Sequence, residues 1–213
     1  MTEPKATNPH PAYRTGRMEA FSDGVFAIAI TLLILEIGVP AGSGGDLLGA
    51  LGDQWPSYLA YFVSFATIGA VWFAHTVITE YLNHADSVLI RLNLLLLLVV
   101  SFLPFPTKLL AEYVHESDAE RIAATVYGIN LLLALVMVSV VWRYAAREHL
   151  VSPDLADEDV KTLTKRLTPT LGLYVVMILV GMFLPIAAVV GYLLLALFIL
   201  IPFSAIRHQP SEA

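Results

Sequence analysis

The sequence contains no cysteine among its 213 residues. This absence excludes disulfide bonds, thiolate metal sites and cysteine nucleophiles. Charged residues are also scarce, because Asp, Glu, Lys and Arg make up only 14% of the chain while hydrophobic residues make up 57%. A soluble globular domain carries about 25% charged residues. The composition therefore predicts an integral membrane protein.

Positive charge is in short supply as well. The chain has 12 Lys and Arg residues against 18 Asp and Glu residues, which gives a formal net charge of −6. Nucleic-acid binding needs a clustered basic face that neutralises phosphates. The sequence therefore offers no support for a nucleic-acid partner.

Long apolar runs predict an all-α fold with six transmembrane helices, since a helix needs roughly 17 to 25 apolar residues to cross a bilayer. The first four helices are expected at about residues 18–39, 55–79, 87–103 and 122–142. The last apolar block, residues 171–201, is too long for one crossing, so we expect two helices with a turn near Leu184 and Pro185. One kinked helix, for five crossings in all, is the alternative. The transmembrane domain would then cover residues 17–206, between polar tails at residues 1–16 and 207–213.

Lys and Arg residues gather on one side of the expected membrane. With six crossings the termini share a side, and that side holds Lys5, Arg14, Arg17, Arg91, Arg143, Arg147, Lys161, Lys165, Arg166 and Arg207. The opposite side keeps only Lys108 and Arg121. Because cytoplasmic loops carry an excess of Lys and Arg, we expect both termini in the cytoplasm.

The two loops expected on the outer side are acidic. Their carboxylates are those of Asp46, Asp53, Glu112, Glu116, Asp118 and Glu120. Carboxylates around a pore mouth concentrate cations and repel anions. Loops that are simply hydrophilic are the alternative, but the shared sign favours a protein that handles cations.

The first expected helix carries the most informative residues. A carboxylate within a membrane helix, such as Asp23, is costly unless it is paired, and it marks a candidate functional site. Further along, Ile28, Leu32 and Leu35 fall within about 60° of one another, with Thr31 at the edge of this stripe and Asp23 about 140° from Ile28. The stripe is explained either by ordinary packing and lipid contact or by several copies of the helix lining a pore. Periodicity alone does not separate the two.

The motif Arg17-x-x-x-Phe21-Ser22-Asp23, followed by Gly24-Val25-x-Ala27-Ile28, resembles that of the transmembrane protein 175 family, the lysosomal-type potassium channels, and of its bacterial members. The similarity extends to Trp72 and His75 in the second helix and to residues 93–98 and 104–107 in the third. It covers the first half of the chain densely and the second half only by hydropathy and topology.

The resemblance implies a fold and a set of site residues. Animal members carry two six-helix repeats and work as dimers, whereas this chain has room for one repeat, which implies a homotetramer with four first helices around the axis. The family pattern makes Ile28 the narrowest hydrophobic ring, Thr31 a layer implicated in selectivity, and Leu32 and Leu35 further layers. A second group resembles a cytoplasmic-side hydrogen-bond network that holds the pore helix: Arg17, Phe21, Ser22 and Asp23, with Trp72 and His75 as partners.

The function that the resemblance implies is passive transport of potassium by a cation channel in the cytoplasmic membrane, surrounded by lipid and without a cofactor other than the permeant K⁺. Widening of the Ile28 rings would open such a hydrophobic constriction. An enzyme is not expected, because no nucleophile with a base and no metal cluster assembles in the sequence. The alternative is a proton-coupled secondary transporter that uses Asp23 and His75, although no inverted repeat or broken helix pair is visible.

Two other patterns are weaker. His75, Glu80 and His84 lack the His-Glu-x-x-His spacing that puts two imidazoles on one helical face, so no metal site is expected. The stretch Val189-Val190-Gly191-Tyr192 lacks the threonine and the second glycine of the filter of ordinary potassium channels. It is expected to be helical.

Overall fold

Helices account for nearly all of the described chain. The computed structural model describes residues 13–39, 42–114, 117–153 and 157–200. The α-helices of this part are α1 (Gly16–Leu32), α2 (Leu47–Asp53), α3 (Trp55–Glu80), α4 (Ser87–Phe102), α5 (Pro104–Glu112), α6 (Ser117–Arg147), α7 (Asp157–Gly181) and α8 (Pro185–Leu200). Two short 3-10 helices, η1 (Leu33–Glu36) and η2 (Ser43–Gly45), lie between α1 and α2. Within the described ranges β-structure is limited to two isolated bridges, which confirms the all-α prediction.

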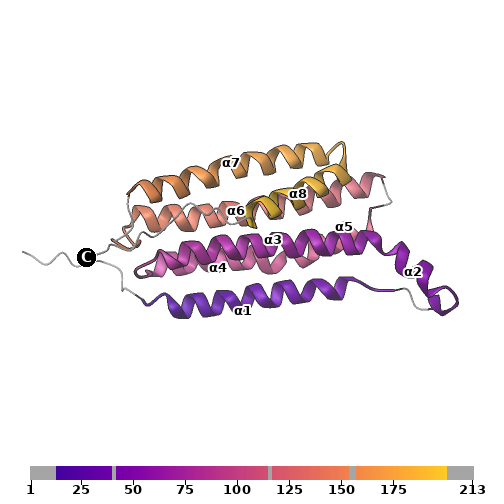
Figure 1. Cartoon of the computed structure of the whole chain (residues 1–213), viewed down its shortest axis with the longest axis horizontal. Helices are drawn as coiled ribbons and strands as arrows, with labels where there is room; N and C mark the ends of the chain where they lie inside the picture. Colours follow the sequence, from indigo (N-terminus) through magenta and orange to yellow (C-terminus); the bar gives the residue numbers. More distant parts are fainter. Residues whose placement is uncertain (1–12, 40–41, 115–116, 154–156, 201–213) are drawn as a thin grey trace, which may run out of the picture.

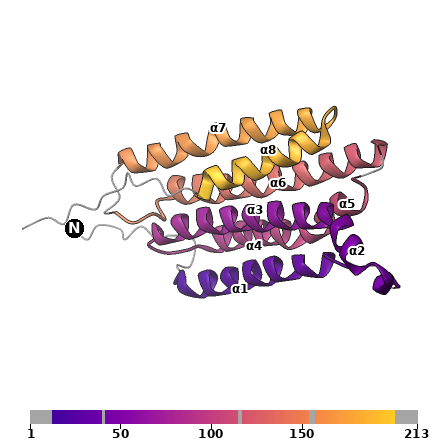
Figure 2. The same cartoon turned by 45° about the vertical axis from the view of Figure 1, so that its right-hand side comes forward.

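The long helices lie side by side in layers along the long axis of the molecule (Figure 1). α7 forms one side of the bundle, α6 and α8 come next, then α3 and α4, and α1 forms the opposite side; Figure 2 shows the same order from a second direction. α8 packs against α3, and α6 packs against α4 and α7. α1 packs against α3 and α4, so one side of α1 faces away from its own chain.

Proline and capping residues explain several helix ends. Asp86 caps α4, because its Oδ1 accepts a hydrogen bond from the backbone N–H of Leu89 at 2.7 Å. Pro104 and Pro185 begin α5 and α8, at a position where the missing N–H of proline has no helical partner to lose. α4 and α5 are separated by Leu103 alone. The expected end of the third helix, at about residue 103, is therefore a joint within one longer apolar segment.

Four segments of the described chain are long and apolar enough to cross a membrane, namely Gly16–Glu36, Trp55–Glu80, Ser87–Glu112 and Asp118–Arg147. The last apolar block divides just before Pro185, where we expected the turn, into the shorter apolar stretches Pro169–Gly181 and Pro185–Leu200. Several apolar helices of this kind indicate a multi-pass membrane protein.

The start of α7 differs from the prediction. We expected this helix from about residue 171, but it begins at Asp157 and contains Pro169 in its interior. An interior proline removes one backbone hydrogen bond and bends a helix without having to end it. Hydropathy detects only the apolar half of such a helix, so the polar first turns were missed.

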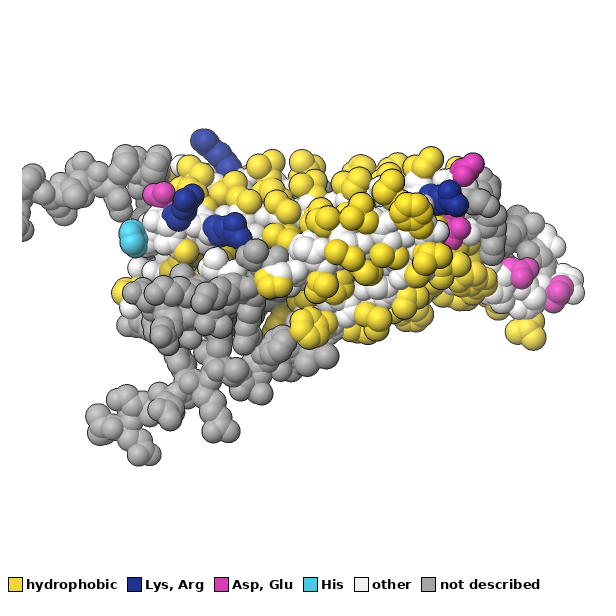
Figure 3. Space-filling view, turned by 90° about the horizontal axis from the view of Figure 1, so that it is seen from above, with side chains coloured by type: hydrophobic (Ala, Val, Ile, Leu, Met, Phe, Trp, Pro, Cys, Tyr) yellow, Lys and Arg dark blue, Asp and Glu magenta, His cyan; other side chains and the backbone are white. Residues whose placement is uncertain are grey.

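Charge is distributed as the sequence predicts. In Figure 3 apolar side chains cover the middle of the visible face, and charged side chains gather toward its two ends. Two bridges, Tyr13 to Ala85 and Leu82 to Val151, hold the start of α1 beside the loops that precede α4 and follow α6. The described basic residues at that end are Arg14, Arg17, Arg91, Arg143 and Arg147, and those at the other end are Lys108 and Arg121.

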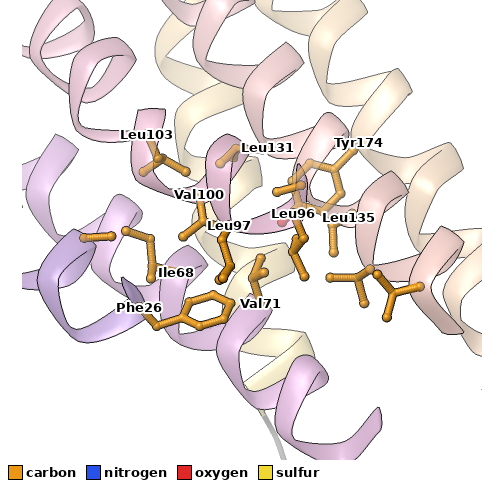
Figure 4. Close-up of a cluster of buried hydrophobic side chains, with 14 of the residues drawn as sticks. Phe26, Ile68, Val71, Leu96, Leu97, Val100, Leu103, Leu131, Leu135 and Tyr174 are labelled. Atoms are coloured by element: carbon orange, nitrogen blue, oxygen red, sulfur yellow. The ribbon is translucent and has the colours of Figure 1, made fainter. Parts of the chain in front are cut away.

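One large apolar cluster joins the layers. Figure 4 shows part of it, with labelled side chains from α1 (Phe26), α3 (Ile68, Val71), α4 (Leu96, Leu97, Val100), the α4–α5 joint (Leu103), α6 (Leu131, Leu135) and α7 (Tyr174). Lipid tails are as apolar as leucine, so such a cluster stabilises the bundle through van der Waals packing rather than through exclusion of water. The stability of the bundle therefore depends on how closely the helices approach one another.

Three tyrosines bring α6, α7 and α8 together. The ring centroid of Tyr192 lies 5.8 Å from that of Tyr127 and 5.9 Å from that of Tyr174. Gly128 on α6 faces the Tyr192 hydroxyl so closely that a Cβ at this position would overlap the oxygen. Glycine at 128 thus permits the approach of α8 to α6.

Replacing Gly128 with Ala should lower the thermal midpoint of the protein in detergent, by the equivalent of about 1–3 kcal/mol, because overpacking forces Tyr192 or α8 to move. Gly172→Ala in α7 is the matched control, since nothing lies within 4 Å of a Cβ built there. Both changes gain about 1 kcal/mol of helix propensity, so the difference between them isolates the overlap. Equal thermal midpoints for the two variants would contradict the packing role of Gly128.

Candidate pore face and its supporting network

α1 has one buried face and one exposed face. Its buried residues recur every three or four positions and are Met18, Ser22, Phe26, Ala29 and, in η1, Leu33. Ile28, Leu32 and Leu35 are 60%, 42% and 73% exposed, and Thr31 is exposed as well. All four residues of the predicted stripe therefore lie on the side of the helix that its own chain leaves uncovered.

The outer end of this helix is shorter than expected. The α-helix ends at Leu32 instead of continuing to residue 39, and η1 carries the chain on to Glu36. A 3-10 turn advances each side chain by about 120° rather than 100°, so Leu35 turns toward the position of Leu32 but stays on the exposed side. The hydroxyl of Thr31 donates a hydrogen bond to the Ile28 carbonyl at 2.9 Å.

A chain of buried hydrogen bonds fastens the buried face of α1 to α3 and α4. Ser22 Oγ donates to the Met18 carbonyl at 2.8 Å, and Asn93 Nδ2 donates to Ser22 Oγ at 2.9 Å. His75 Nε2 lies 2.8 Å from Asn93 Oδ1 and is the donor, because a carbonyl oxygen can only accept. The His75 ring also lies against Phe26, with 5.5 Å between the ring centroids.

Asp23 belongs to a separate contact at the surface of the chain. Its Oδ1 accepts a hydrogen bond from Trp72 Nε1 at 2.9 Å, and both residues are exposed. The two partners expected from the second helix thus take different motif residues, since His75 reaches Ser22 through Asn93 while Trp72 reaches Asp23. Asp23 and His75 do not hydrogen-bond to each other in the described contacts.

The remaining motif residues lie elsewhere. Arg17 and Phe21 are exposed, and their spacing of eleven and seven residues from Ile28 puts them on the same side of α1 as the stripe. Within the described part of a single chain, no ion pair joins Arg17 to Asp23. The structure therefore places Ser22 and Asp23, but not Arg17 and Phe21, in hydrogen bonds with α3 and α4.

Asn93 is the residue that sequence reasoning missed as a member of the network. It is the one polar side chain in the leucine-rich run of residues 92–98, and that isolation was the available signal. A second cluster of buried polar side chains is also hydrogen-bonded, and it joins α3, α5 and α6. There Ser64 Oγ lies 2.7 Å from Thr107 Oγ1 and 2.9 Å from the hydroxyl of Tyr127.

The C-terminal end of α1, continued by η1, opens onto a polar hollow of about 420 Å³. Lys108 lies at its wall, 3.9 Å from a carboxylate oxygen of Glu36 and 3.8 Å from one of Glu112. Asp53 and Leu35 also line the hollow. The loops at this end of the bundle therefore bring carboxylates to the end of the exposed stripe, and Lys108 neutralises part of their charge.

Two sequence expectations concern other sites. Among the described residues no group of three or more His, Asp or Glu side chains is placed to hold a metal ion. The stretch that faintly resembles a potassium-channel filter, residues 189–192, lies in α8 and is helical as expected.

A family match, related proteins and a solved structure all indicate the same family for this chain. Residues 17–104 match the family described as endosomal/lysosomal potassium channel TMEM175. A protein described as a potassium channel from Streptomyces collinus is 50% identical over 65% of this chain and 68% of its own length. Another potassium channel, from Chamaesiphon minutus, is 46% identical over 76% of this chain and 81% of its own length. The Gallus gallus protein, described as the endosomal/lysosomal proton channel TMEM175, is 37% identical, but the match spans only 31% of its length.

The fold is similar to that of a solved relative as well. The crystal structure of a homolog of the lysosomal potassium-selective channel TMEM175, from Chamaesiphon minutus, matches with a TM-score of 0.79 and 39% identity over 87% of this chain and 96% of that one. These relatives are described as channels, in agreement with the expectation that the chain is not an enzyme. The motif in α1, its partners on α3 and α4, and the similarity in sequence and fold lead to one conclusion: the chain belongs to the TMEM175 family.

Proposed function

We propose that the chain is a potassium-permeable cation channel, built as a homotetramer with α1 of each copy around a central pore. The observation that carries the proposal is the orientation of α1. Its stripe of Ile28, Thr31, Leu32 and Leu35 faces away from its own chain, in a family whose relatives include potassium channels. An apolar face with a hydroxyl in its middle suits a narrow pore that several copies share.

The channel lies in the cytoplasmic membrane and crosses it six times, through α1, α3, the α4–α5 segment, α6, α7 and α8. An even number of crossings leaves both termini on one side, and the excess of Lys and Arg there assigns that side to the cytoplasm. The carboxylates at the outer hollow then face the exterior and attract cations. The transmembrane potential drives them with about 2.3 kcal/mol per elementary charge per 100 mV.

The residues of the stripe have different roles in the proposed pore. Rings of Ile28 form the narrowest constriction, which excludes water and opens when the rings move apart. Leu32 and Leu35 add further apolar layers. Because the Thr31 hydroxyl hydrogen is already donated to the Ile28 carbonyl, the lone pairs of its oxygen are what it offers to a cation.

The motif residues hold α1 against α3 and α4, on the side of the helix that faces away from the pore. The Ser22–Asn93–His75 chain fixes the rotation of α1, and the Trp72–Asp23 hydrogen bond adds a second attachment to α3. The alternative, a proton-coupled transporter with Asp23 and His75 as its relay, has less support, because the two side chains have different partners. Arg17 and Phe21 complete the cytoplasmic end of the pore face.

Flux from proteoliposomes distinguishes these functions. We expect K⁺ to leave loaded vesicles down its gradient, faster than Na⁺, without chloride flux and without a proton gradient. Because animal relatives are described as proton channels, proton flux is measured in the same preparation. Saturating K⁺ flux that tracks pH would support the transporter, and proton flux without K⁺ flux would overturn the potassium channel.

Replacing Ile28 with Asn should raise K⁺ flux several-fold. A ring of Asn side chains, one from each copy, holds water in the constriction, whereas a ring of isoleucines excludes water. Ile129→Asn on α6 is the matched control, since Ile129 is 52% exposed against 60% for Ile28 and α6 belongs to another layer of the bundle than α1 (Figure 1). Equal flux through wild type and the Ile28 variant, with both proteins correctly assembled, removes Ile28 from the constriction.

Replacing Asn93 with Leu should lower stability by about 1–3 kcal/mol, because it leaves Ser22 and His75 buried without their partner. Asn130→Leu is a matched control: this asparagine is also buried, but its one described hydrogen bond, to the Val99 carbonyl, is long at 3.4 Å. Thermal unfolding in detergent measures both variants. Similar losses at the two positions would mean that the Ser22–Asn93–His75 chain has no special role in holding α1.

A further inference from the structure

Two different flanks of the molecule adjoin the exposed stripe of α1. α1 packs against both α3 and α4, and the bundle continues from α3 to α8 on one flank and from α4 to α6 on the other (Figures 1 and 2). A ring of copies around α1 must bring each flank of one copy against the opposite flank of the next, because a closed ring with more than two members uses head-to-tail contacts. The two flanks should therefore fit each other.

The α3 flank is aromatic and has a notch. Phe62, Phe65 and Trp72 are 62%, 45% and 41% exposed, and their spacing of three and seven residues puts them on one face. Gly69 lies on the same face between Phe65 and Trp72, and nothing lies within 4 Å of a Cβ built on it. The notch is thus open and bordered by large rings.

The α4 flank is a ridge. Leu95, Leu98, Phe102 and Phe105 are exposed at spacings of three to four residues, and Leu94, which is also exposed, lies one turn before Leu98. Leu98 is the most exposed of the five, at 64%. Leu98 is therefore the side chain of this ridge that its own chain covers least.

The notch and the top of the ridge lie at the same depth. α3 and α4 are antiparallel, and the hydrogen bond between His75 and Asn93 marks one level on both. Gly69 is six residues outward from His75 and Leu98 is five residues outward from Asn93, which at 1.5 Å per residue is about 9 Å and about 7.5 Å. By the same count, Phe65 on α3 and Phe102 on α4 also lie at nearly the same depth. Rotation about an axis parallel to the helices preserves these levels.

Asp23 indicates that protein rather than lipid covers the α3 flank. Its carboxylate is exposed in the single chain and bonded to Trp72, at the edge of this flank. A carboxylate that faces hydrocarbon is costly, and intramembrane carboxylates nearly always face protein or a water-filled space. The exposed stripe of α1 is continuous with the same edge.

We propose that the α3 flank of one copy packs against the α4 flank of the next, with Leu98 seated in the notch at Gly69 between Phe65 and Trp72. Small residues allow membrane helices to approach closely, and here the approach draws α1 of neighbouring copies toward the axis. This interface rests on the proposed tetramer and adds the surfaces that assemble it. It also makes the pore diameter depend on how deeply Leu98 enters the notch.

Cysteine cross-linking tests the interface, and the absence of native cysteine means that every cross-link comes from an introduced residue. The double variant Gly69→Cys/Leu98→Cys is oxidised in native membranes, or treated with a short bismaleimide, and run on a denaturing gel. We expect bands up to the tetramer for the double variant and monomer for each single variant. The control pair Gly69→Cys/Val176→Cys, with Val176 exposed on the outermost helix α7, should stay monomeric.

Each outcome decides the question. A protein that is tetrameric by native mass spectrometry but gives no 69–98 cross-links overturns this interface and leaves the channel proposal intact. Cross-linking of Leu98→Cys alone into dimers means that like flanks meet, which also overturns it. Cross-linked tetramers of the double variant, together with wild-type protein that passes no K⁺, keep the interface and overturn the channel. A monomer under all conditions overturns both. Leu98→Ala should lower the tetramer fraction more than Leu179→Ala, a control at an exposed position of α7.

Discussion

The hydrogen-bond chain from Ser22 through Asn93 to His75 sets the orientation of α1 on which everything else in the molecule depends. Each of these side chains comes from a different helix, and each is buried. A buried polar group without a partner is costly, and the interior of a membrane protein offers no water to replace one. Rotation of α1 about its axis would break this chain, so the network decides which residues of the helix can face outward.

The bundle consequently has two parts that are stabilised in different ways. α1, α3 and α4 are joined by a chain of buried polar contacts, whereas α6, α7 and α8 meet mainly through apolar packing and the tyrosine group at Tyr127, Tyr174 and Tyr192, with one hydrogen bond from Trp142 on α6 to Thr164 on α7. The family match at residues 17–104 coincides with the first part. Hydrogen-bonded groups restrict residue identity, while packed apolar positions mainly restrict volume, so sequence similarity fades sooner in the second part.

The relatives are described with two different ions, potassium for the bacterial proteins and protons for the animal ones. In this chain the two side chains best suited to carry a proton have different hydrogen-bond partners, Asn93 for His75 and Trp72 for Asp23. The exposed stripe of α1 carries no ionisable residue between Ile28 and Leu35. Such a stripe suits a metal cation that crosses with its hydration water better than a proton that is passed from one side chain to the next.

The sequence by itself determined the all-α membrane class, the approximate positions of the apolar helices, the turn before Pro185 and the motif that identifies the family. These follow from composition and from a period of 3.6 residues, which are properties of a single segment. Only the tertiary structure decided that the Ile28 stripe faces away from its own chain, that His75 and Trp72 serve different motif residues, that Asn93 links α1 to α3, and that α7 starts at Asp157. Periodicity tells which residues share a face of a helix. What covers that face depends on segments far apart in the chain, and only packing brings those segments together.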